Sequence, residues 1–398
     1  MDFLNRKTVE DIDVNGKRVL VRCDYNVPFD SVGNITDTKR IDESIKTLRY
    51  LIDHKAKIII CSHRGRPKGA VKPELSLAPT IPYVSKVLNQ QVQIATDVIG
   101  ESAQTLCANL EEGQVIMLEN VRFEPGEEAN DPTFAKKLAA FADIFVNDAF
   151  GTSHRAHAST AGVAAYIPAV CGYLIQKELQ ILGNALHTPK RPFVAILGGA
   201  KVSDKIGVII ALLDKIDTLI IGGGMAYTFM NALGYSIGNS LCESDKLDLA
   251  QDIMAKAKEK EVKFLIPIDN IIANKFAQDA QWQVADSDQI PEGWMGMDIG
   301  PKSSDLFTHA IEHAGTVFWN GPLGVSEWNN FAKGTYKVAQ ALANSKAYSI
   351  IGGGDSAASV EKLGFATQMS HISTGGGASL ELIEGLELPG ISCLLQKE

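Results

Sequence analysis

The sequence is built from a series of short apolar runs, rich in Val and Ile, each followed directly by polar or glycine-rich residues. Because these runs are apolar at consecutive positions and not only at alternate ones, they are typical of strands buried on both faces of a parallel sheet. The runs are found at 17–28, 56–67, 113–123 and 142–151 in the first half, and at 191–201, 217–226, 262–270, 315–324, 347–356 and 371–385 in the second.

Helical patterns lie between these runs, and several of them open with Ser or Asp at the position expected for an N-cap. The clearest are at 131–142, 203–216, 244–261 and 331–345. Alternation of strands and helices predicts βαβ units, in which helices cover both faces of a parallel sheet. We therefore expect an α/β fold with doubly wound, Rossmann-like sheets.

The length of 398 residues predicts two domains, because single hydrophobic cores rarely grow this large. The segment 171–192 has leucines and an isoleucine at helical spacing, and Pro189 and Pro192 end the pattern. We predict an N-terminal domain over 1–172, a connecting helix over 173–189 and a C-terminal domain over 190–385. A central cleft and a hinge would separate the two domains.

Composition excludes several classes of partner. The net charge of -9 argues against nucleic acid. No apolar run approaches the roughly 18 residues of a membrane span, and residues 1–17 lack the apolar core of a signal peptide, so no membrane partner and a cytoplasmic location are expected. The six cysteines form no C-x-x-C pair, which favours reduced thiols over zinc ligands or disulfides.

Basic residues follow the predicted strands of the first half. Ligands of open parallel sheets bind outside the carboxyl ends of the strands, so these residues are expected to meet at one edge. Planar guanidinium groups bind phosphate and carboxylate through two hydrogen bonds, which predicts a small, multiply anionic ligand. The residues in question are Arg22, Asp24, Asn26, His63, Arg66, Arg122, His154, Arg155 and His157, with Arg40 before the next helix.

Each of these residues also has an interpretation that involves no ligand. A single Arg or His in a loop is commonly a solvated surface group, and Asp24 could simply orient Arg22. Asp24 and Asn26 could equally hydrogen-bond a hydroxyl of the ligand. We expect His154 and His157 to lie behind the binding residues and not in contact with the ligand.

Glycines follow the predicted strands of the second half. Such turns let backbone N–H groups approach a nucleotide closely, although any one of them could be only a tight strand-to-helix turn. Lys201 is placed to meet phosphate oxygens, and Asp355 could hold Mg²⁺ or act as a helix N-cap. The turns are Gly198 and Gly199, Gly222 to Gly224, Gly352 to Gly354, and Gly375 to Gly377.

Two other functions fit these patterns less well. A dinucleotide-dependent dehydrogenase needs G-x-G-x-x-G followed by an acid about 20 residues later, and no glycine run here has that spacing. A non-catalytic sugar-phosphate or nucleotide binding protein would not need anion-binding groups on both domains.

The motifs "VLVRCDYNVP", "SHRGRP", "LENVRF", "AFGTSHRAHAS", "LGGAKVSDKI", "GGGMAYTF", "GWMGMDIGP", "WNGPLGVSE", "GGGDSAAS" and "ISTGGGASLELIEG" resemble, in this order, those of the phosphoglycerate kinase family. The resemblance extends from residue 17 to 385. It implies a kinase that transfers a phosphoryl group between 1,3-bisphosphoglycerate and MgADP, in line and after domain closure, giving 3-phosphoglycerate and MgATP. It also implies glycerate binding by the N-terminal domain, nucleotide binding by the C-terminal domain, and a monomer.

The resemblance carries site residues over motif by motif. The glycerate would be bound by Asp24, Tyr25, Asn26, Arg40, His63, Arg64, Gly65, Arg66, Arg122 and Arg155. The nucleotide would be bound by Lys201, Lys205, Gly223, Gly296, Asn320, Glu327, Gly353, Gly354, Asp355 and Ser356, with Asp355 at the Mg²⁺. Catalytic roles would fall to Arg40, Lys201, Gly375 and Gly376.

Small departures from the family pattern are Cys23, Tyr25 and Leu323, none of which removes a polar group from these sets. The tail 386–398 resembles the segment that returns to the N-terminal domain in this family. No HRD or DFG motif is present, so a kinase with a side-chain base is not indicated.

Overall fold

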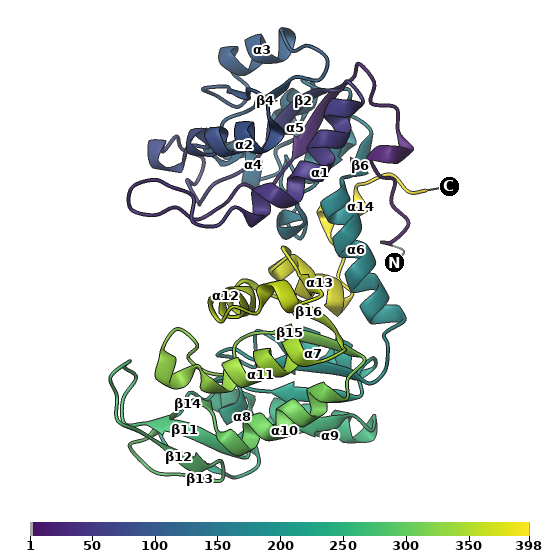
Figure 1. Cartoon of the computed structure of the whole chain (residues 1–398). Helices are drawn as coiled ribbons and strands as arrows, with labels where there is room; N and C mark the ends of the chain where they lie inside the picture. Colours follow the sequence, from purple (N-terminus) through teal and green to yellow (C-terminus); the bar gives the residue numbers. More distant parts are fainter. Residues whose placement is uncertain (1–2, 398) are drawn as a thin grey trace. The chain divides into compact units, whose positions relative to one another are not determined.

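The protein is described by a computed structural model that covers residues 3–397. The chain divides into two compact units. One contains the chain up to Gln180 together with the segment from Glu387 onward, and the other contains Ile181–Leu386 (Figure 1).

The first unit is built on a six-stranded parallel sheet with the strand order β3-β4-β2-β1-β5-β6. Its strands are β1 (Arg18–Arg22), β2 (Lys57–Cys61), β3 (Gln93–Ile94), β4 (Val115–Met117), β5 (Ile144–Asn147) and β6 (Ala169–Cys171). Its α-helices include α1 (Lys39–Asp53), α2 (Ile81–Leu88), α3 (Glu101–Ala108), α4 (Pro125–Glu128) and α5 (Pro132–Ala139). The four strands predicted in the first half all lie in this sheet.

The second unit contains another six-stranded parallel sheet, with the order β10-β8-β7-β15-β16-β17. Its strands are β7 (Phe193–Leu197), β8 (Thr218–Ile221), β10 (Lys263–Leu265), β15 (Thr316–Asn320), β16 (Tyr348–Gly352) and β17 (His371–Ile372). Its α-helices include α7 (Ile206–Leu213), α8 (Ala226–Ala232), α9 (Leu247–Glu259), α10 (Pro301–Glu312), α11 (Lys333–Asn344), α12 (Gly354–Lys362) and α13 (Gly377–Glu384). The predicted α/β class with two parallel sheets is confirmed.

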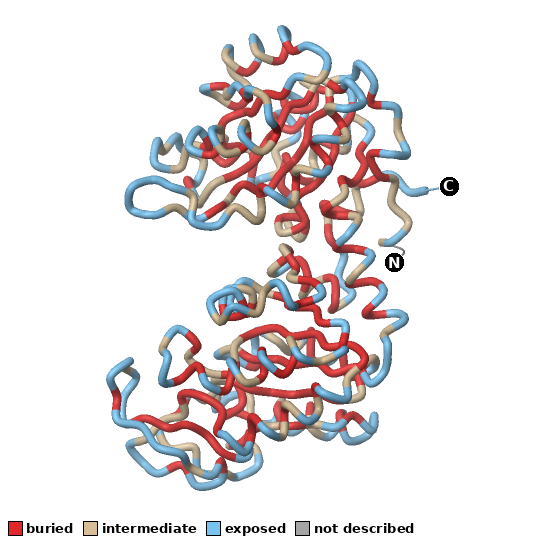
Figure 2. The backbone as a smooth tube through the Cα atoms, viewed as in Figure 1, coloured by how far each residue is buried: buried red, intermediate tan, exposed pale blue. Residues whose placement is uncertain are grey.

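Burial explains why the apolar runs form these strands. Ile58, Ile59 and Ile60 are consecutive in β2, and all three are fully buried. Successive side chains of a strand point to opposite faces, so helices must cover both faces of the sheet. Figure 2 shows the central strands of each unit as buried segments beneath more exposed helices. Each buried Ile contributes about 1.5–3 kcal/mol to this arrangement.

Antiparallel strands in the second unit are a feature that the sequence patterns did not predict. A three-stranded sheet has the order β12-β11-β14, and a two-stranded parallel pair joins β13 to β9. The bounds are β9 (Ser236–Ile237), β11 (Asp269–Ala273), β12 (Trp282–Asp286), β13 (Gln289–Ile290) and β14 (Met295–Ile299). Strand β12 is mostly exposed, so it lacks the continuous apolar run that marks a buried parallel strand.

Helix α6 (Tyr173–His187) forms in the segment predicted to connect the domains, and it ends two residues before the predicted limit of 189. The division between the units falls within this helix, after Gln180. Its first turn is held by the buried carboxylate of Asp148, whose Oδ1 accepts hydrogen bonds from the backbone N–H groups of Leu174 (2.9 Å) and Ile175 (3.4 Å). The N-terminus of the helix is thereby fixed to the end of β5.

The C-terminal tail packs on the first unit and contains α14 (Pro389–Ser392). The backbone N–H of Leu395 donates to Ala169 O over 2.9 Å, and that of Gly390 donates to Ser153 O over 2.9 Å. The side-chain amide of Asn147 also donates to Gly390 O over 2.8 Å. These bonds tie the tail to the strand edge formed by β5 and β6.

All six cysteines are unpaired in the structure. Within residues 3–397, no helix has the length and apolar character needed to cross a membrane.

Candidate active site

Arg22 lies at the end of β1 and organises the basic residues of the first unit. Its side chain is fully buried, its Nε donates to Ser159 Oγ over 2.9 Å, and its Nη2 lies 3.2 Å from His63 Nδ1. A guanidinium group can only donate hydrogen bonds, so His63 Nδ1 is the acceptor and the proton of this neutral ring sits on Nε2.

The charges around His63 show which guanidinium groups converge. Burial lowers the pKa of His63 well below its usual value, and the positive charges of Arg22, Arg122, Arg40 and Arg155 lower this pKa further. These four arginines come from β1, from the loops after β4 and β5, and from helix α1. The predicted meeting of basic residues at the carboxyl edge of this sheet is therefore present within the first unit.

Direct contacts join the first two loops of this edge. Asn26 Oδ1 accepts a hydrogen bond from the backbone N–H of Gly65 over 2.9 Å. Arg40 Nη1 donates to Asp24 Oδ2 and to Asn26 O, each over 3.1 Å. The Arg40 side chain keeps 38% of its surface exposed, whereas that of Asp24 keeps 9%. Arg40 can therefore reach a ligand, and Asp24 helps to hold it in place.

Arg122 carries a hydrogen-bonding group without a partner. Its Nη1 donates to Gly65 O over 2.8 Å, and its Nε lies 3.3 Å from Glu128 Oε1. Its Nη2 is buried and has no hydrogen-bond partner in the part of the chain that the structure describes. Leaving a buried charged donor unsatisfied is costly, and an anionic ligand oxygen would satisfy it.

Two other predicted glycerate residues, Tyr25 and Arg64, use their side chains in packing. The side chain of Tyr25 is fully buried, with its hydroxyl 3.0 Å from Ser44 Oγ, so only the Tyr25 backbone could face a ligand. The guanidinium of Arg64 lies 3.8 Å from the centre of the Phe29 ring and donates to Ser76 O, which makes it a structural contact.

Arg66 and Arg155 complete the predicted set. Arg66 is exposed, and no hydrogen bond or ion pair joins it to the cluster within residues 3–397. Arg155 Nε donates to His154 Nε2 over 3.1 Å, and its charge acts on both His63 and Arg122.

Glu127 is an important residue of this cluster that the sequence patterns missed. It is fully buried, and it accepts hydrogen bonds from the Ser159 backbone N–H (2.9 Å) and from Ser159 Oγ (2.6 Å). Burial raises the pKa of Glu127, while the positive charge of Arg22 opposes that rise. His157 lies beside it, and burial lowers the pKa of His157 to about 4. Within "FEPGEEAND", Glu127 reads as one of several surface acids.

In the second unit, a pocket of about 360 Å³ lies at the carboxyl ends of β7, β15 and β16. The first turns of α12 and α13 line it, as does Lys205, which directly precedes α7. Helix N-termini present free N–H groups and a positive dipole end, so this pocket suits an anion such as phosphate. Its predicted lining residues are Lys201, Lys205, Asn320, Gly353, Gly354, Asp355, Ser356 and Gly376, and it also includes Asp204, Gly321 and Pro322.

Four of the glycines that line this pocket have a positive φ, and Gly353 and Gly376 stand at the starts of α12 and α13. Gly353 has a φ of 88°, and a Cβ there would lie 2.6 Å from Asn320 Nδ2. Gly376 has a φ of 52° and precedes α13, with open space where a Cβ would project. Since Gly353 is the N-cap of α12, the alternative prediction that Asp355 caps this helix is wrong, and Asp355 lies inside the first turn.

The charged groups of the pocket are two lysines and two carboxylates. Lys205 is partly buried and contacts Asn320 Oδ1, and burial lowers its pKa. Lys201, Asp204 and Asp355 are exposed at the pocket. One or two carboxylates beside phosphate oxygens are the usual ligands of Mg²⁺ in nucleotide sites, so Asp355 and Asp204 fit this ion.

Four predicted residues lie outside the pocket lining. Gly223 packs against it, because a Cβ at Gly223 would lie 2.7 Å from Gly199 N. Gly296 lies in β14 and donates its N–H to Ser240 Oγ over 2.9 Å. Glu327 is exposed, and its backbone O accepts a hydrogen bond from Lys362. Gly375 donates its N–H to Ser373 Oγ over 3.0 Å.

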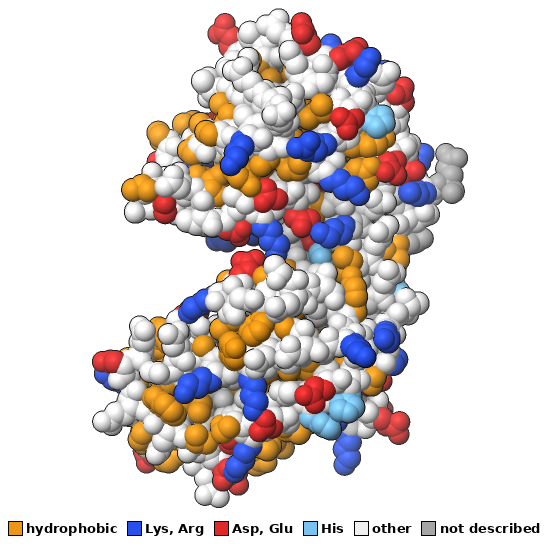
Figure 3. Space-filling model, viewed as in Figure 1, with side chains coloured by type: hydrophobic (Ala, Val, Ile, Leu, Met, Phe, Trp, Pro, Cys, Tyr) orange, Lys and Arg blue, Asp and Glu red, His pale blue; other side chains and the backbone are white. Residues whose placement is uncertain are grey.

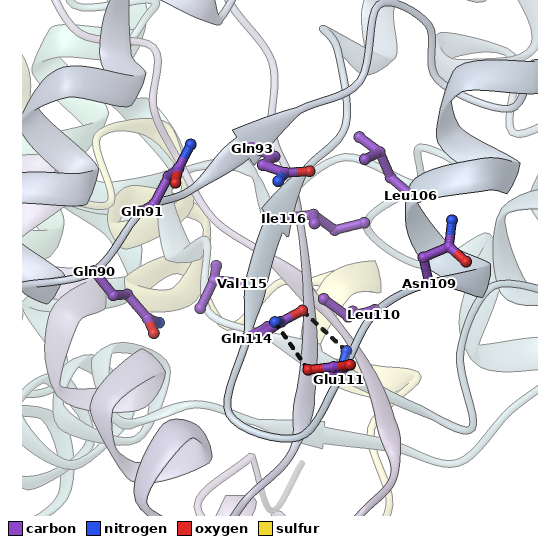
Figure 4. Close-up of a pocket in the computed structure, with 10 residues that line it drawn as sticks. All are labelled: Gln90, Gln91, Gln93, Leu106, Asn109, Leu110, Glu111, Gln114, Val115 and Ile116. Carbon is purple, nitrogen blue, oxygen red and sulfur yellow. Dashed lines mark hydrogen bonds between the residues drawn. The ribbon is translucent and has the colours of Figure 1, made fainter.

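A larger cavity, of about 460 Å³, lies in the first unit beside β3 and β4 (Figure 4). Amide, apolar and acidic side chains line it, without a lysine or arginine, so it does not suit a phosphorylated ligand. The lining residues are Gln90, Gln91, Gln93, Leu106, Asn109, Leu110, Glu111, Gln114, Val115 and Ile116.

One α/β unit gathers guanidinium groups that suit a small anion, and the other surrounds a pocket of about 360 Å³ with helix N-termini that suit phosphate groups. This pair of sites is the one expected of a kinase that acts on a small anionic substrate. Residues 9–386 match the family model described as phosphoglycerate kinase. The chain belongs to the phosphoglycerate kinase family, as its motifs predicted.

Relatives and solved structures agree with this assignment. The chain is 57% identical over 396 residues to the phosphoglycerate kinase of Clostridium tetani, covering 99% of this chain and 98% of the relative. It is 58% identical over 397 residues to the phosphoglycerate kinase of Clostridium botulinum strain Eklund 17B, and the match covers 99% of this chain and 100% of the relative. The structure of phosphoglycerate kinase from Coxiella burnetii matches with a TM-score of 0.88 and 45% identity, covering 98% of each chain. The structure of phosphoglycerate kinase from Pyrococcus horikoshii OT3 matches with a TM-score of 0.84 and 31% identity, and the match covers 98% of each chain.

Proposed function

We propose that this protein catalyses reversible phosphoryl transfer from 1,3-bisphosphoglycerate to MgADP, giving 3-phosphoglycerate and MgATP in glycolysis and gluconeogenesis. The single observation that carries the proposal is the arginine cluster at the carboxyl edge of the first sheet, with the buried, unpartnered Nη2 of Arg122. The names of the similar proteins agree with this reaction.

In this proposal the first unit binds the glycerate substrate. Arg122 and Arg155 bind its phosphate and Arg40 binds its reacting carboxyl group, because these guanidinium groups converge on neutral His63. Asp24 and Asn26 bind the hydroxyl group of the substrate. Arg22 acts indirectly: it holds His63 and is itself held by Ser159, whose hydroxyl donates to Glu127.

The second unit binds the nucleotide in its glycine-rich pocket. Lys201 and Lys205 neutralise phosphate oxygens, and the backbone N–H groups at Gly353, Gly354 and Gly376 donate to them. Asp355, with Asp204 beside it, holds Mg²⁺, which supplies positive charge to the phosphate oxygens. Gly223, Gly296 and Glu327 would shape the nucleotide site from outside the pocket lining.

No residue needs to act as a base in this reaction. The acceptor in the ATP-consuming direction is a carboxylate, and acids of this type are ionised at pH 7, since their pKa values lie near 4. Catalysis then depends on alignment and on stabilising the charge of the group in transit. Arg40, Lys201 and the backbone N–H group at Gly376 supply that stabilisation, and the N–H of Gly375 would join them only on leaving Ser373 Oγ.

The two half-sites must come together for transfer, because reacting atoms need to approach to about 3–3.5 Å. We propose that the two units close around the substrates by movement at the segments where the chain passes between them, near 180 and 386. We further propose a monomeric cytoplasmic enzyme, and the six unpaired cysteines agree with a reducing compartment.

A coupled assay of ADP formation from ATP tests the reaction, with and without 3-phosphoglycerate. We expect turnover that requires 3-phosphoglycerate and is abolished in Arg122→Ala. The matched control is Arg18→Ala, because Arg18 opens β1 at the opposite edge of the same sheet and pairs with Asp143. ATP consumption that is independent of 3-phosphoglycerate, or a normal rate in Arg122→Ala, would refute the proposal.

A further inference from the structure

A cluster of two histidines and one glutamate lies on the surface of the second unit, where α10 ends. His309, Glu312 and His313 are all exposed, and one ligand atom from each lies within 4.8 Å of the others. The two imidazole rings are one helical turn apart, with centroids separated by 4.7 Å. Figure 3 shows histidine side chains gathered with acidic ones on the surface over α10.

The backbone prepares one of these rings for a cation. His313 Nδ1 lies 3.0 Å from the backbone carbonyl oxygen of His309. A carbonyl can only accept, so Nδ1 carries the proton and Nε2 presents its lone pair outward. Histidines that bind metals commonly have this arrangement, in which one nitrogen donates to a carbonyl and the other coordinates. The negative end of the helix dipole at this terminus also favours a cation.

We propose that His309, Glu312 and His313 form a binding site for a divalent transition-metal ion such as Zn²⁺, Ni²⁺ or Cu²⁺. Imidazole nitrogens select these ions, whereas Mg²⁺ prefers oxygen ligands and retains its water. Two ligands on a tetrahedral zinc lie about 3.4 Å apart, given bond lengths of about 2.1 Å. Exposed side chains within 4.8 Å of one another reach this spacing by small rotations.

This site is separate from the nucleotide pocket. His313 lies just before the first residue of β15, Thr316, whereas Asn320, which lines the pocket, ends that strand. Five residues of strand span roughly 16 Å, so the two sites lie at opposite edges of the sheet. Transition-metal binding should therefore leave the affinity for MgADP unchanged.

The test is calorimetric titration of the whole protein with Ni²⁺ in the absence of nucleotide, since Ni²⁺ would displace Mg²⁺ from ADP. The variants are His309→Gln, His313→Gln and Glu312→Gln. His54→Gln is a matched control, because His54 also caps a helix, α1, and its Nδ1 contacts the carbonyl oxygen four residues earlier over 2.8 Å. Tyr50 stands there in place of a second histidine, so His54 alone should not chelate.

We expect the wild-type protein and His54→Gln to bind Ni²⁺ equally. Either histidine variant should weaken binding by at least about tenfold, the smallest loss usual even for indirect partners of a metal. Glu312→Gln should weaken it less but measurably, and all variants should retain wild-type kinase activity. Equal Ni²⁺ affinity in the wild-type protein and both histidine variants, or no binding by the wild-type protein, would overturn the proposal. Unchanged affinity in Glu312→Gln would remove the third ligand.

Discussion

The buried carboxyl group of Asp148 gives the protein a pH-dependent weakness at the start of α6. Its Oδ1 accepts from Leu174 and Ile175, but its Oδ2 is buried without a hydrogen-bond partner within residues 3–397. Burial raises the pKa of Asp148 from 3.8 to about 7. We predict that Asp148→Asn stabilises the protein at pH 8, because asparagine keeps the accepting oxygen and removes the buried charge.

The sign and size of the effect follow from linkage. Between pH 4 and pH 7 the unfolded chain has released this proton while the folded chain still holds it, so raising the pH destabilises the folded wild-type protein. A difference of about three pKa units at about 1.4 kcal/mol per unit gives about 4 kcal/mol, which is reached near pH 7 and stays constant above it. The gain in free energy of unfolding from Asp148→Asn should therefore be near zero at pH 4 and rise to about 4 kcal/mol near pH 7.

Urea unfolding from pH 4 to pH 9 measures this prediction, with the free energy of unfolding compared between variant and wild type at each pH. Asp13→Asn is the matched control, because Asp13 is exposed and its Oδ1 likewise accepts a backbone N–H, that of Asn15. Its stability should follow that of the wild-type protein at every pH. A difference between Asp148→Asn and wild type that does not rise with pH would refute the reasoning.

Three further predictions concern the proposed active site. Lys201→Ala should lower kcat by about 10² to 10³ in both directions, the usual loss for one preorganised transition-state contact, and a near-normal kcat would remove Lys201 from the mechanism. Arg122→Lys should raise the KM for 3-phosphoglycerate about tenfold and leave the KM for MgATP unchanged, because lysine keeps the positive charge but cannot donate two parallel hydrogen bonds. An equal change in both KM values would count against a role of Arg122 in glycerate binding. Gly376→Ala should cost about 1–3 kcal/mol of unfolding free energy through its φ of 52°, with Gly354→Ala as the control without a positive φ; equal stability of the two variants would contradict this strain.

Local patterns were sufficient to predict the fold class. Runs such as 58–61 are apolar at every position, and burial on both faces of a parallel sheet is the environment that such runs need. The N-cap of α5 was also readable, since Asp131 accepts the backbone N–H of Phe134 over 2.8 Å. The strand β12 was not readable, because an exposed antiparallel strand has no comparable apolar run.

The candidate site was only partly readable from the sequence. The motifs named Arg40, Arg122 and Lys201, and the structure places the first two in the arginine cluster and the third at the glycine-rich pocket. They also named Tyr25 and Arg64, whose side chains turn out to be used in packing. A motif records that a residue type stands at a position, but it does not record which way the side chain points.

The sequence by itself determined the buried parallel strands, the helices between them and the family to which the chain belongs, because these depend on residue type and spacing along the chain. Only the tertiary structure decided the roles of Glu127 and Asp148, which look like surface acids in the sequence but are fully buried. The same holds for His309 and His313, whose hydrogen bond and ring spacing depend on the helix that carries them. Burial and charge at a side chain are set by neighbours distant in sequence, and these neighbours exist only once the chain has folded.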